Sequence, residues 1–166
     1  MDQTPDKLQI LSAMLPKAML QALTPEALEA VPPAARHGAM VVIHSFPFRV
    51  GRESRVVKIN GRLESIERPK KDNSAPTNDI YLIDRGHRLN ISREHFEIRH
   101  EGREYRLVDR GSACGTRVGD SEIGGDDHGG VVPLRDGDII AIGVAGTPYT
   151  YRFVSFDEFS VVKNEG

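Results

Sequence analysis

Three short islands of the sequence carry residue types that can bind an oxyanion. They are Gly51-Arg52, Ser92-Arg93-Glu94-His95 and Gly115-Thr116, and each lies at the end of a run of β-type residues, where loops gather. An arginine guanidinium holds two oxygens at once, a serine hydroxyl donates a hydrogen bond, and a tight glycine turn lets a ligand backbone approach. This combination suits the recognition of a phosphate group on a peptide.

The charge of the chain agrees with a local oxyanion site and argues against a general nucleic-acid binder. The net charge is −2, so the chain lacks the basic excess typical of proteins that bind nucleic acids. Between Asp84 and Gly119 there are eight arginines and no lysine, a bias that favours planar, forked recognition of oxyanions. For most of these arginines we favour the simpler interpretation, in which they lie solvated on strand faces.

The composition also predicts the cellular location of the protein. Hydrophobic residues make up 39% of the chain and charged residues 28%, which is ordinary for a soluble globular protein. Cys114 is the single cysteine, so an internal disulfide framework is excluded. The N-terminus has no basic region followed by an apolar run, and the longest uncharged stretch, 139–151, is shorter than the ~20 residues that span a bilayer. We therefore expect no membrane association and a cytoplasmic location.

The chain divides at Pro32-Pro33 into a helical extension, residues 1–38, and a larger domain. Apolar residues recur at helical spacing in the extension, and Pro16 interrupts them. These residues are Leu8, Leu11, Leu15, Met19 and Leu23. Thr24-Pro25-Glu26 has the features of a helix start. We predict two or three short helices whose apolar stripe packs on the following domain, with docking on a partner protein as the alternative.

From residue 39 onward the pattern predicts an all-β domain. Short β-type runs alternate with glycine-containing turns, without helical periodicity between them, which favours a β-sandwich over residues 39–156. The runs are 40–43, 48–50, 80–83, 96–99, 105–108, 131–134, 138–142 and 149–154. Residues 54–77 are expected to form an insertion, with a hairpin turning at Asn60-Gly61 and then a flexible loop. Residues 157–166 form a C-terminal tail.

Six motifs, in this order, resemble those of the forkhead-associated (FHA) domain family. They are Gly51-Arg52, Asn78-Asp79-Ile80, Ser92-Arg93-Glu94-His95, Asp109-Arg110-Gly111-Ser112, Gly115-Thr116 and Leu134-Arg135-Asp136-Gly137-Asp138-Ile139. The resemblance covers roughly residues 39–156. It implies an FHA-type β-sandwich of about eleven strands that binds phosphothreonine peptides with the loops at one end, and it implies no cofactor.

The resemblance assigns roles to individual residues. Arg52 matches the arginine that pairs with the phosphate or the peptide backbone, and Ser92 matches the serine that donates to a phosphate oxygen. Arg93 is a candidate for a second cation, and Arg88 is a weaker candidate of the same kind. His95 matches a structural histidine that braces the binding loops, and Gly51 belongs to the same structural framework.

The segment around the third island, residues 109–116, departs from the family pattern, and we call it the third loop. Gly115 and Thr116 match the family, but the two positions before them hold Ala113 and Cys114 where a hydroxyl residue and an asparagine are usual. A thiol is a weak hydrogen-bond partner and the alanine side chain has none to offer. Each lost contact costs about 0.5–1.5 kcal/mol, so we expect phosphopeptide binding here to be weakened.

Two alternative functions are weighed against phosphopeptide binding, and a metal site is considered as well. The first alternative is a phosphate-independent interaction module that uses the N-terminal helices or the insertion 53–78. The second is an enzyme with Cys114 as nucleophile, which we do not expect because no second feature supports activation of the thiol. No metal site is expected, since His95 and His100 would face opposite sides of a strand.

The expected role is that of a signalling adaptor. The partner would be a phosphothreonine-containing protein, such as a Ser/Thr kinase or its substrate. A regulatory variant is also open, in which the site binds a phosphorylated threonine of its own N-terminal segment. Thr4 is the best candidate, Thr77 in the long loop is another, and Thr24 is better explained as a helix cap.

Overall fold

Thirteen strands and three short helices make up the described chain, a computed structural model that describes residues 5–53, 56–65 and 76–166. The helices are α1 (Lys7–Met14), α2 (Pro25–Ala30) and the 3-10 turn η1 (Pro33–Ala35). The strands are β1 (Ala18–Ala22), β2 (Met40–Ile43), β3 (Phe48–Arg52), β4 (Val56–Ile59), β5 (Arg62–Ser65), β6 (Ile80–Leu82), β7 (Phe96–Glu101), β8 (Glu104–Asp109), β9 (Thr116–Val118), β10 (Ser121–Ile123), β11 (Gly130–Leu134), β12 (Ile139–Ile142) and β13 (Thr150–Ser155). Within the described part of the chain, none of the helices has the length and hydropathy of a membrane-spanning segment.

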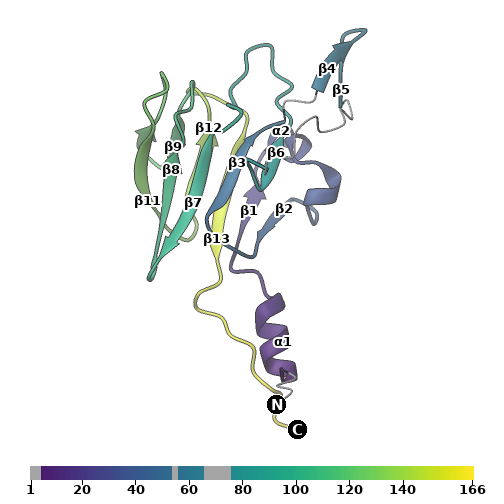
Figure 1. Cartoon of the computed structure of the whole chain (residues 1–166), viewed down its shortest axis with the longest axis vertical. Coiled ribbons are helices and arrows are strands. Elements are labelled where there is room, and N and C mark those ends of the chain that lie inside the picture. Colours follow the sequence, from purple (N-terminus) through teal and green to yellow (C-terminus); the bar gives the residue numbers. More distant parts are fainter. Residues whose placement is uncertain (1–4, 54–55, 66–75) are drawn as a thin grey trace.

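Two sheets form the sandwich, as Figure 1 shows. One has six strands in the order β10-β9-β12-β13-β1-β2, and the other has five in the order β11-β8-β7-β3-β6. The predicted sandwich of about eleven strands is therefore confirmed. Alternating side chains build its interior: Phe96 and Ile98 of β7 are fully buried, whereas Arg99 between the buried positions and the turn is exposed. Phe153 of the opposite sheet is fully buried in the same core.

The N-terminal segment differs from the expected helical extension. Thr24 caps α2, as predicted, by accepting a hydrogen bond from the Ala27 N–H at 3.1 Å. Residues 18–22, however, form β1, which pairs with both β13 and β2 inside the six-stranded sheet. The helical spacing of Met19 misled the prediction because tertiary pairing with two strands outweighs weak local helix preference. The sandwich thus begins at Ala18, well before residue 39.

The apolar stripe of the first helix does not pack on the domain. None of the α1 residues is buried, and Leu11 remains 51% exposed. The expectation that this stripe covers the sandwich is therefore wrong for α1. The helix lies at the end of the molecule that carries both termini (Figure 1).

The insertion contains the predicted hairpin. β4 and β5 pair antiparallel, and Asn60 and Gly61 both have positive φ, as the predicted type I′ turn requires. The flexible tip expected after it falls largely on residues 66–75, which lie outside the described residues. The hairpin projects from the end of the molecule opposite α1 (Figure 1).

Strand register gathers the three islands at that same end. β3 runs parallel to β6 and antiparallel to β7, so the end of β3 at Arg52 lies beside the segment that joins β6 to β7. Gly130 at the start of β11 pairs with Asp109 at the end of β8, and Thr116 pairs with Ile123 and Ile142. We call this end the loop rim. It comprises Arg52 and the segments 83–95, 110–115, 124–129 and 143–149.

Candidate functional site

Arg52 is held against the segment that carries Ser92. Its backbone N–H donates to the Ser92 carbonyl at 2.9 Å, and its Nε donates to the Ile91 carbonyl at 2.8 Å. The first bond holds the backbone of Arg52, and the second orients the guanidinium plane. Its two terminal nitrogens form no hydrogen bond or ion pair within the part of the chain that the structure describes. Because the side chain is half-buried, the terminal nitrogens are a preorganised donor pair at the loop rim.

The Ser92 hydroxyl faces the third loop. Its Oγ accepts a hydrogen bond from the Ala113 N–H at 3.0 Å. A hydroxyl has one hydrogen to donate, and no described residue accepts it. The accepting bond therefore orients Ser92 while leaving its own hydrogen available to an incoming oxygen. The structure brings Arg52 and Ser92, two of the predicted site residues, to one place.

His95 ties two loops of the rim together from below. Its Nδ1 accepts from the Ser92 N–H and its Nε2 donates to the Gly115 carbonyl, both at 2.9 Å. These partners require the neutral ring with the hydrogen on Nε2. The side chain is fully buried, and burial lowers the pKa of His95 despite the opposing effects of the Gly115 carbonyl and of Asp109 and Asp84.

The hydrogen bonds that such a brace requires are thus present. Both ring nitrogens of His95 are used in these bonds, so neither offers a lone pair to a metal ion. His100 instead stacks on Tyr105, with ring centroids 4.2 Å apart. In the described parts of the chain, no three side chains of the metal-binding types gather in one place.

Asp109 organises the third loop. It is the last inward-facing residue of β8 and is buried. One carboxylate oxygen accepts from the N–H groups of Gly111 and Ser112, at 3.1 and 2.8 Å. The other accepts from the hydroxyls of Ser112 and Thr116, at 2.7 and 2.9 Å. Four bonds to one buried carboxylate hold the loop that presents Ala113 and its N–H to Ser92.

Asp84 organises the β6–β7 segment in the same manner, although it was not among the predicted site residues. Its carboxylate accepts from the N–H groups of Gly86, Asn90 and Ile91 at 3.0, 2.6 and 2.9 Å, and from the Tyr149 hydroxyl at 2.7 Å. Burial, together with this bond, raises the pKa of Tyr149 to about 12. An aspartate directly after a buried strand and two residues before a glycine was the available signal for such a turn.

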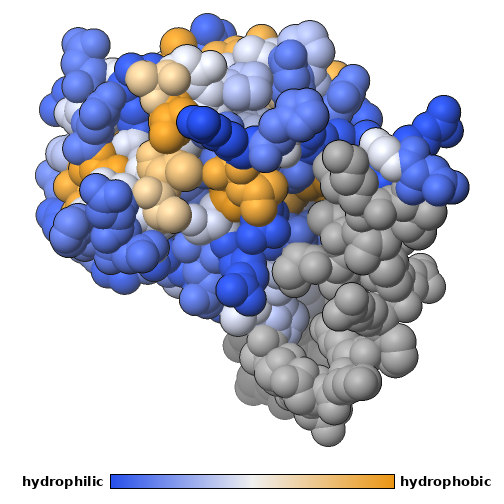
Figure 2. All heavy atoms as spheres, turned by 90° about the horizontal axis from the view of Figure 1, so that it is seen from above, coloured by the Kyte–Doolittle hydropathy of each residue, from blue (hydrophilic) through white to orange (hydrophobic). Residues whose placement is uncertain are grey.

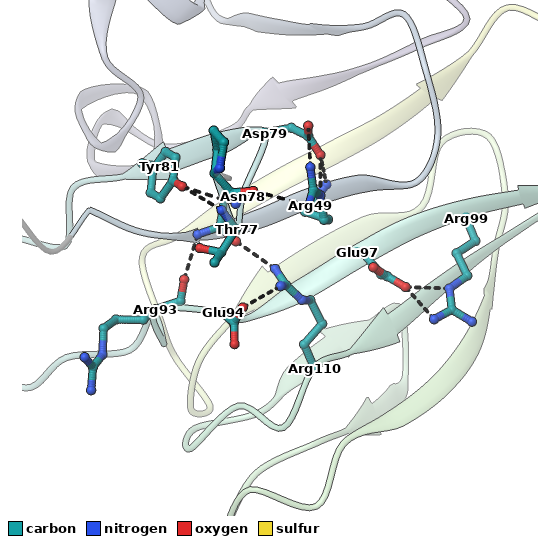
Figure 3. Close-up of polar contacts among 11 residues, drawn as sticks. Arg49, Thr77, Asn78, Asp79, Tyr81, Arg93, Glu94, Glu97, Arg99 and Arg110 are labelled. Carbon is teal, nitrogen blue, oxygen red and sulfur yellow. Dashed lines mark hydrogen bonds and ion pairs between the residues drawn. The ribbon is translucent and has the colours of Figure 1, made fainter. Parts of the chain in front are cut away.

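Asn78 supports Arg93, the residue after Ser92, and its contacts with Arg93 and Arg110 are visible in Figure 3. Its Nδ2 donates to the Arg93 carbonyl at 2.7 Å, and its Oδ1 accepts from Arg110 at 2.7 Å. Arg110 also pairs with Glu94 at 2.8 Å. Gly51 makes this packing possible, because a Cβ there would lie 2.0 Å from the Arg93 carbonyl oxygen and 2.5 Å from Nδ2 of Asn78. The predicted framework role of Gly51 therefore has a steric cause.

The remaining predicted residues also lie at the loop rim, except Thr116, which directly follows it. The Arg93 side chain is exposed and points away from the Asn78 cluster (Figure 3). Arg88 is exposed as well.

The Cys114 thiol is half-buried and donates to the Leu89 carbonyl at 3.4 Å. Gly115 has a φ of +80° and is packed against Ile123 and residues 124–125, which explains why a glycine stands there. Thr116 is buried and is the first residue of β9.

The surface of this end is mostly hydrophilic, with a few hydrophobic groups near its middle, as the view from above shows (Figure 2). Among the rim residues, Leu89 and Val144 are 49% and 53% exposed. They lie close together because the Val144 N–H donates to Asn90, the residue after Leu89. The rim therefore offers polar donors beside a small apolar area, which is a surface suited to an extended peptide.

Comparison with known proteins places the chain among one family. The family model described as the FHA domain matches residues 48–143. No curated protein matches the chain in sequence.

Several solved structures are similar to this chain. One is EmbR of Mycobacterium tuberculosis, in complex with a low-affinity phosphopeptide, with 21% identity, a TM-score of 0.46, and coverage of 89% of this chain and 26% of EmbR. The chain thus spans about a quarter of the length of EmbR. Another is the FHA domain of a hypothetical protein of Arabidopsis thaliana, with 21% identity, a TM-score of 0.48, and coverage of 91% and 92%. A third is the FHA domain of FhaA, complexed with the intracellular domain of a second protein, with 18% identity, a TM-score of 0.42, and coverage of 82% and 97%.

Proposed function

The chain belongs to the forkhead-associated family, and from this premise we propose that its loop rim binds a phosphothreonine peptide of a partner protein. In this role the protein is a signalling adaptor. The partner is a phosphothreonine-containing protein, such as a Ser/Thr kinase or its substrate, and the interaction takes place in the cytoplasm. Catalysis by this chain is not part of the proposal.

One observation carries the proposal: Arg52 is bonded to both residues of the Ile91-Ser92 segment, so its guanidinium and the Ser92 hydroxyl are presented together. A phosphothreonine carries about −1.5 to −2 charges and three strong acceptor oxygens. The terminal nitrogens of Arg52 and the hydroxyl hydrogen of Ser92 are donors of the kind that such oxygens accept. A hydrogen bond to a charged group contributes about 1.5–3 kcal/mol, so the two side chains supply much of the phosphate dependence.

The third loop sets the strength of binding. In the proposed complex, Cys114 and Ala113 face the peptide backbone where the family usually offers an amide and a hydroxyl. The Cys114 thiol is already turned to the Leu89 carbonyl. Two absent contacts of about 0.5–1.5 kcal/mol each lower the affinity by roughly one to two powers of ten. The proposed complex is therefore a weak and readily reversible one.

The test is a calorimetric titration with a degenerate phosphothreonine peptide library and its unphosphorylated counterpart. We expect binding of the phosphorylated library by the wild type and loss of that binding in Arg52→Ala. Arg106→Ala is the matched control, since Arg106 is an exposed arginine that pairs with Glu101 and Glu104 near the β7–β8 turn. Equal binding of phosphorylated and unphosphorylated peptides by the wild type would contradict the proposal.

A second candidate function is favoured by the first helix. Between α1 and the C-terminal tail lies a groove of about 580 Å³ with an apolar lining that includes Leu15, Phe156 and Phe159. A phosphate-independent partner bound there would be lost on removal of residues 1–15 and unaffected by Arg52→Ala. Pull-down with these two variants separates the two functions. The insertion 53–78 stays a further alternative for such contacts.

Self-binding of a phosphorylated segment is a regulatory variant of the first proposal. Thr4 lies outside the described residues. The Thr24 hydroxyl is occupied, because it caps α2 and also donates to the Pro148 carbonyl. Thr77 is exposed and immediately precedes Asn78, close to the rim. Mass spectrometry of the protein from its native host tests this variant, and an unphosphorylated N-terminal segment would count against it.

A further inference from the structure

Charged side chains of opposite sign lie on opposite sides of the loop 112–114, which contacts Ser92 of the proposed phosphate site. Segment 83–95 exposes Arg85, Arg88 and Arg93, which we call the basic flank. Segment 124–129 exposes Asp126 and Asp127, which we call the acidic flank. None of these five side chains forms an ion pair in residues 5–53, 56–65 and 76–166. Their charges are therefore available to a ligand.

The backbone places the two flanks on either side of residues 112–114. On one side, the Ala113 N–H donates to Ser92 and the Cys114 thiol donates to the Leu89 carbonyl, so the β6–β7 segment is joined to this loop. On the other side, the Asp126 N–H donates to the Ala113 carbonyl and the Asp127 N–H donates to the Ser112 carbonyl, at 3.0 and 3.1 Å. The loop 112–114 thus separates the arginines from the aspartates.

The other carboxylates of this end do not cancel the polarity. Asp84 and Asp109 are buried and bonded to backbone and hydroxyl donors. Glu94 is engaged by Arg110. The exposed charge of the rim therefore changes sign from one side of loop 112–114 to the other.

We propose that the rim selects a phosphothreonine flanked by acidic residues on one side and basic residues on the other. This inference rests on the proposed function. Loop 112–114 is joined to segment 124–129 by backbone hydrogen bonds and to segment 83–95 through the side chains of Ser92 and Cys114. Side-chain bridges set backbones somewhat farther apart than the ~5 Å of paired strands, so the flanks are roughly 10–15 Å apart, which an extended peptide covers in about three to five residues. The charged ligand residues thus lie within about five positions of the phosphothreonine, so the flanks set both the sequence preference and the direction of the bound peptide.

Two peptides of identical composition and opposite order provide the test. One is Asp-Asp-Ala-phosphothreonine-Ala-Lys-Lys and the other is Lys-Lys-Ala-phosphothreonine-Ala-Asp-Asp, each also prepared without phosphate. Net charge is the same in both, so non-specific attraction cancels. We expect one order to bind about tenfold more tightly, since exposed ion pairs are individually weak and several act together. The ratio should shrink toward one near 1 M salt, where the Debye length is ~3 Å.

Two double variants test whether the ratio of the two peptide affinities depends on the charged flanks. Asp126→Asn with Asp127→Asn keeps side chains that tolerate the positive φ values of 49° and 62° found there, and it should reduce the ratio to about threefold, as should Arg85→Gln with Arg88→Gln. Arg103→Gln in the β7–β8 turn is the control that should leave the ratio unchanged.

Each result that contradicts the reasoning contradicts a different part of it. Equal affinity for the two orders, with phosphate dependence intact, would overturn the polarity and leave the proposed function standing. Loss of phosphate dependence in both orders would overturn both. An unequal ratio that persists in both double variants would also overturn the assignment to these flanks.

Discussion

His95 is the position where a single substitution should separate the loops of the rim. In His95→Ala the Ser92 N–H and the Gly115 carbonyl both lose their partner. Each buried group left unsatisfied costs about 1–3 kcal/mol, and the cavity left by the imidazole adds to this. We expect the free energy of unfolding to fall by about 3–5 kcal/mol, a large share of the ~5–15 kcal/mol of a typical domain.

The same contacts predict a pH dependence with a definite sign. Because burial lowers the pKa of His95 in the folded state, the unfolded chain, with its pKa near ~6.5, binds the proton more readily. Stability from neutral His95 is therefore complete above about pH 6.5 and is lost as the pH falls through that value toward the lower folded pKa. Protonation of Nδ1 would also remove the acceptor for the Ser92 N–H.

Urea denaturation at pH 7.5 and 5.5 measures both effects. His95→Gln retains a donor and an acceptor, so it should lose less stability than His95→Ala and show a smaller change between the two pH values than the wild type. His87→Ala, an exposed histidine of the same segment, should behave like the wild type. A loss below about 0.5 kcal/mol in His95→Ala, the range of ordinary surface substitutions, would refute the bracing role.

Three further predictions address the site and the extension. Gly51→Ala forces a Cβ against the Arg93 carbonyl and Asn78, and denaturation should show a loss of about 1–3 kcal/mol; an unchanged midpoint would contradict the steric argument. Cys114→Asn should strengthen phosphothreonine peptide binding about two- to tenfold in calorimetry, whereas weaker binding would show that the thiol is not a deficient contact. Removal of residues 1–15 should change the free energy of unfolding by less than about 1 kcal/mol, because α1 buries no side chain.

The regular part of the fold was predictable because its pattern is local. Alternation around Phe96 and Ile98, and the turn residues Asn60-Gly61, follow from the two-residue period of a strand and from the positive φ that a type I′ turn requires. β1 was not predictable in this way. Its residues have helical spacing to their neighbours, and the pairing with β2 and β13 that decides their state comes from segments far along the chain.

The same distinction between local pattern and long-range pairing applies to the candidate site. The residue types alone indicate which side chains can bind an oxyanion, since a guanidinium, a hydroxyl and a glycine turn have the same chemistry wherever they lie in the chain. The tertiary structure decided that Arg52 is anchored to Ile91 and Ser92, that Asp84 and Asp109 hold two loops from inside, and that the arginines and aspartates of the rim lie on opposite sides. Those facts depend on strand register and on hydrogen bonds between distant segments. The residue types specify which donors and acceptors exist, but only the packing of the chain decides which donor meets which acceptor.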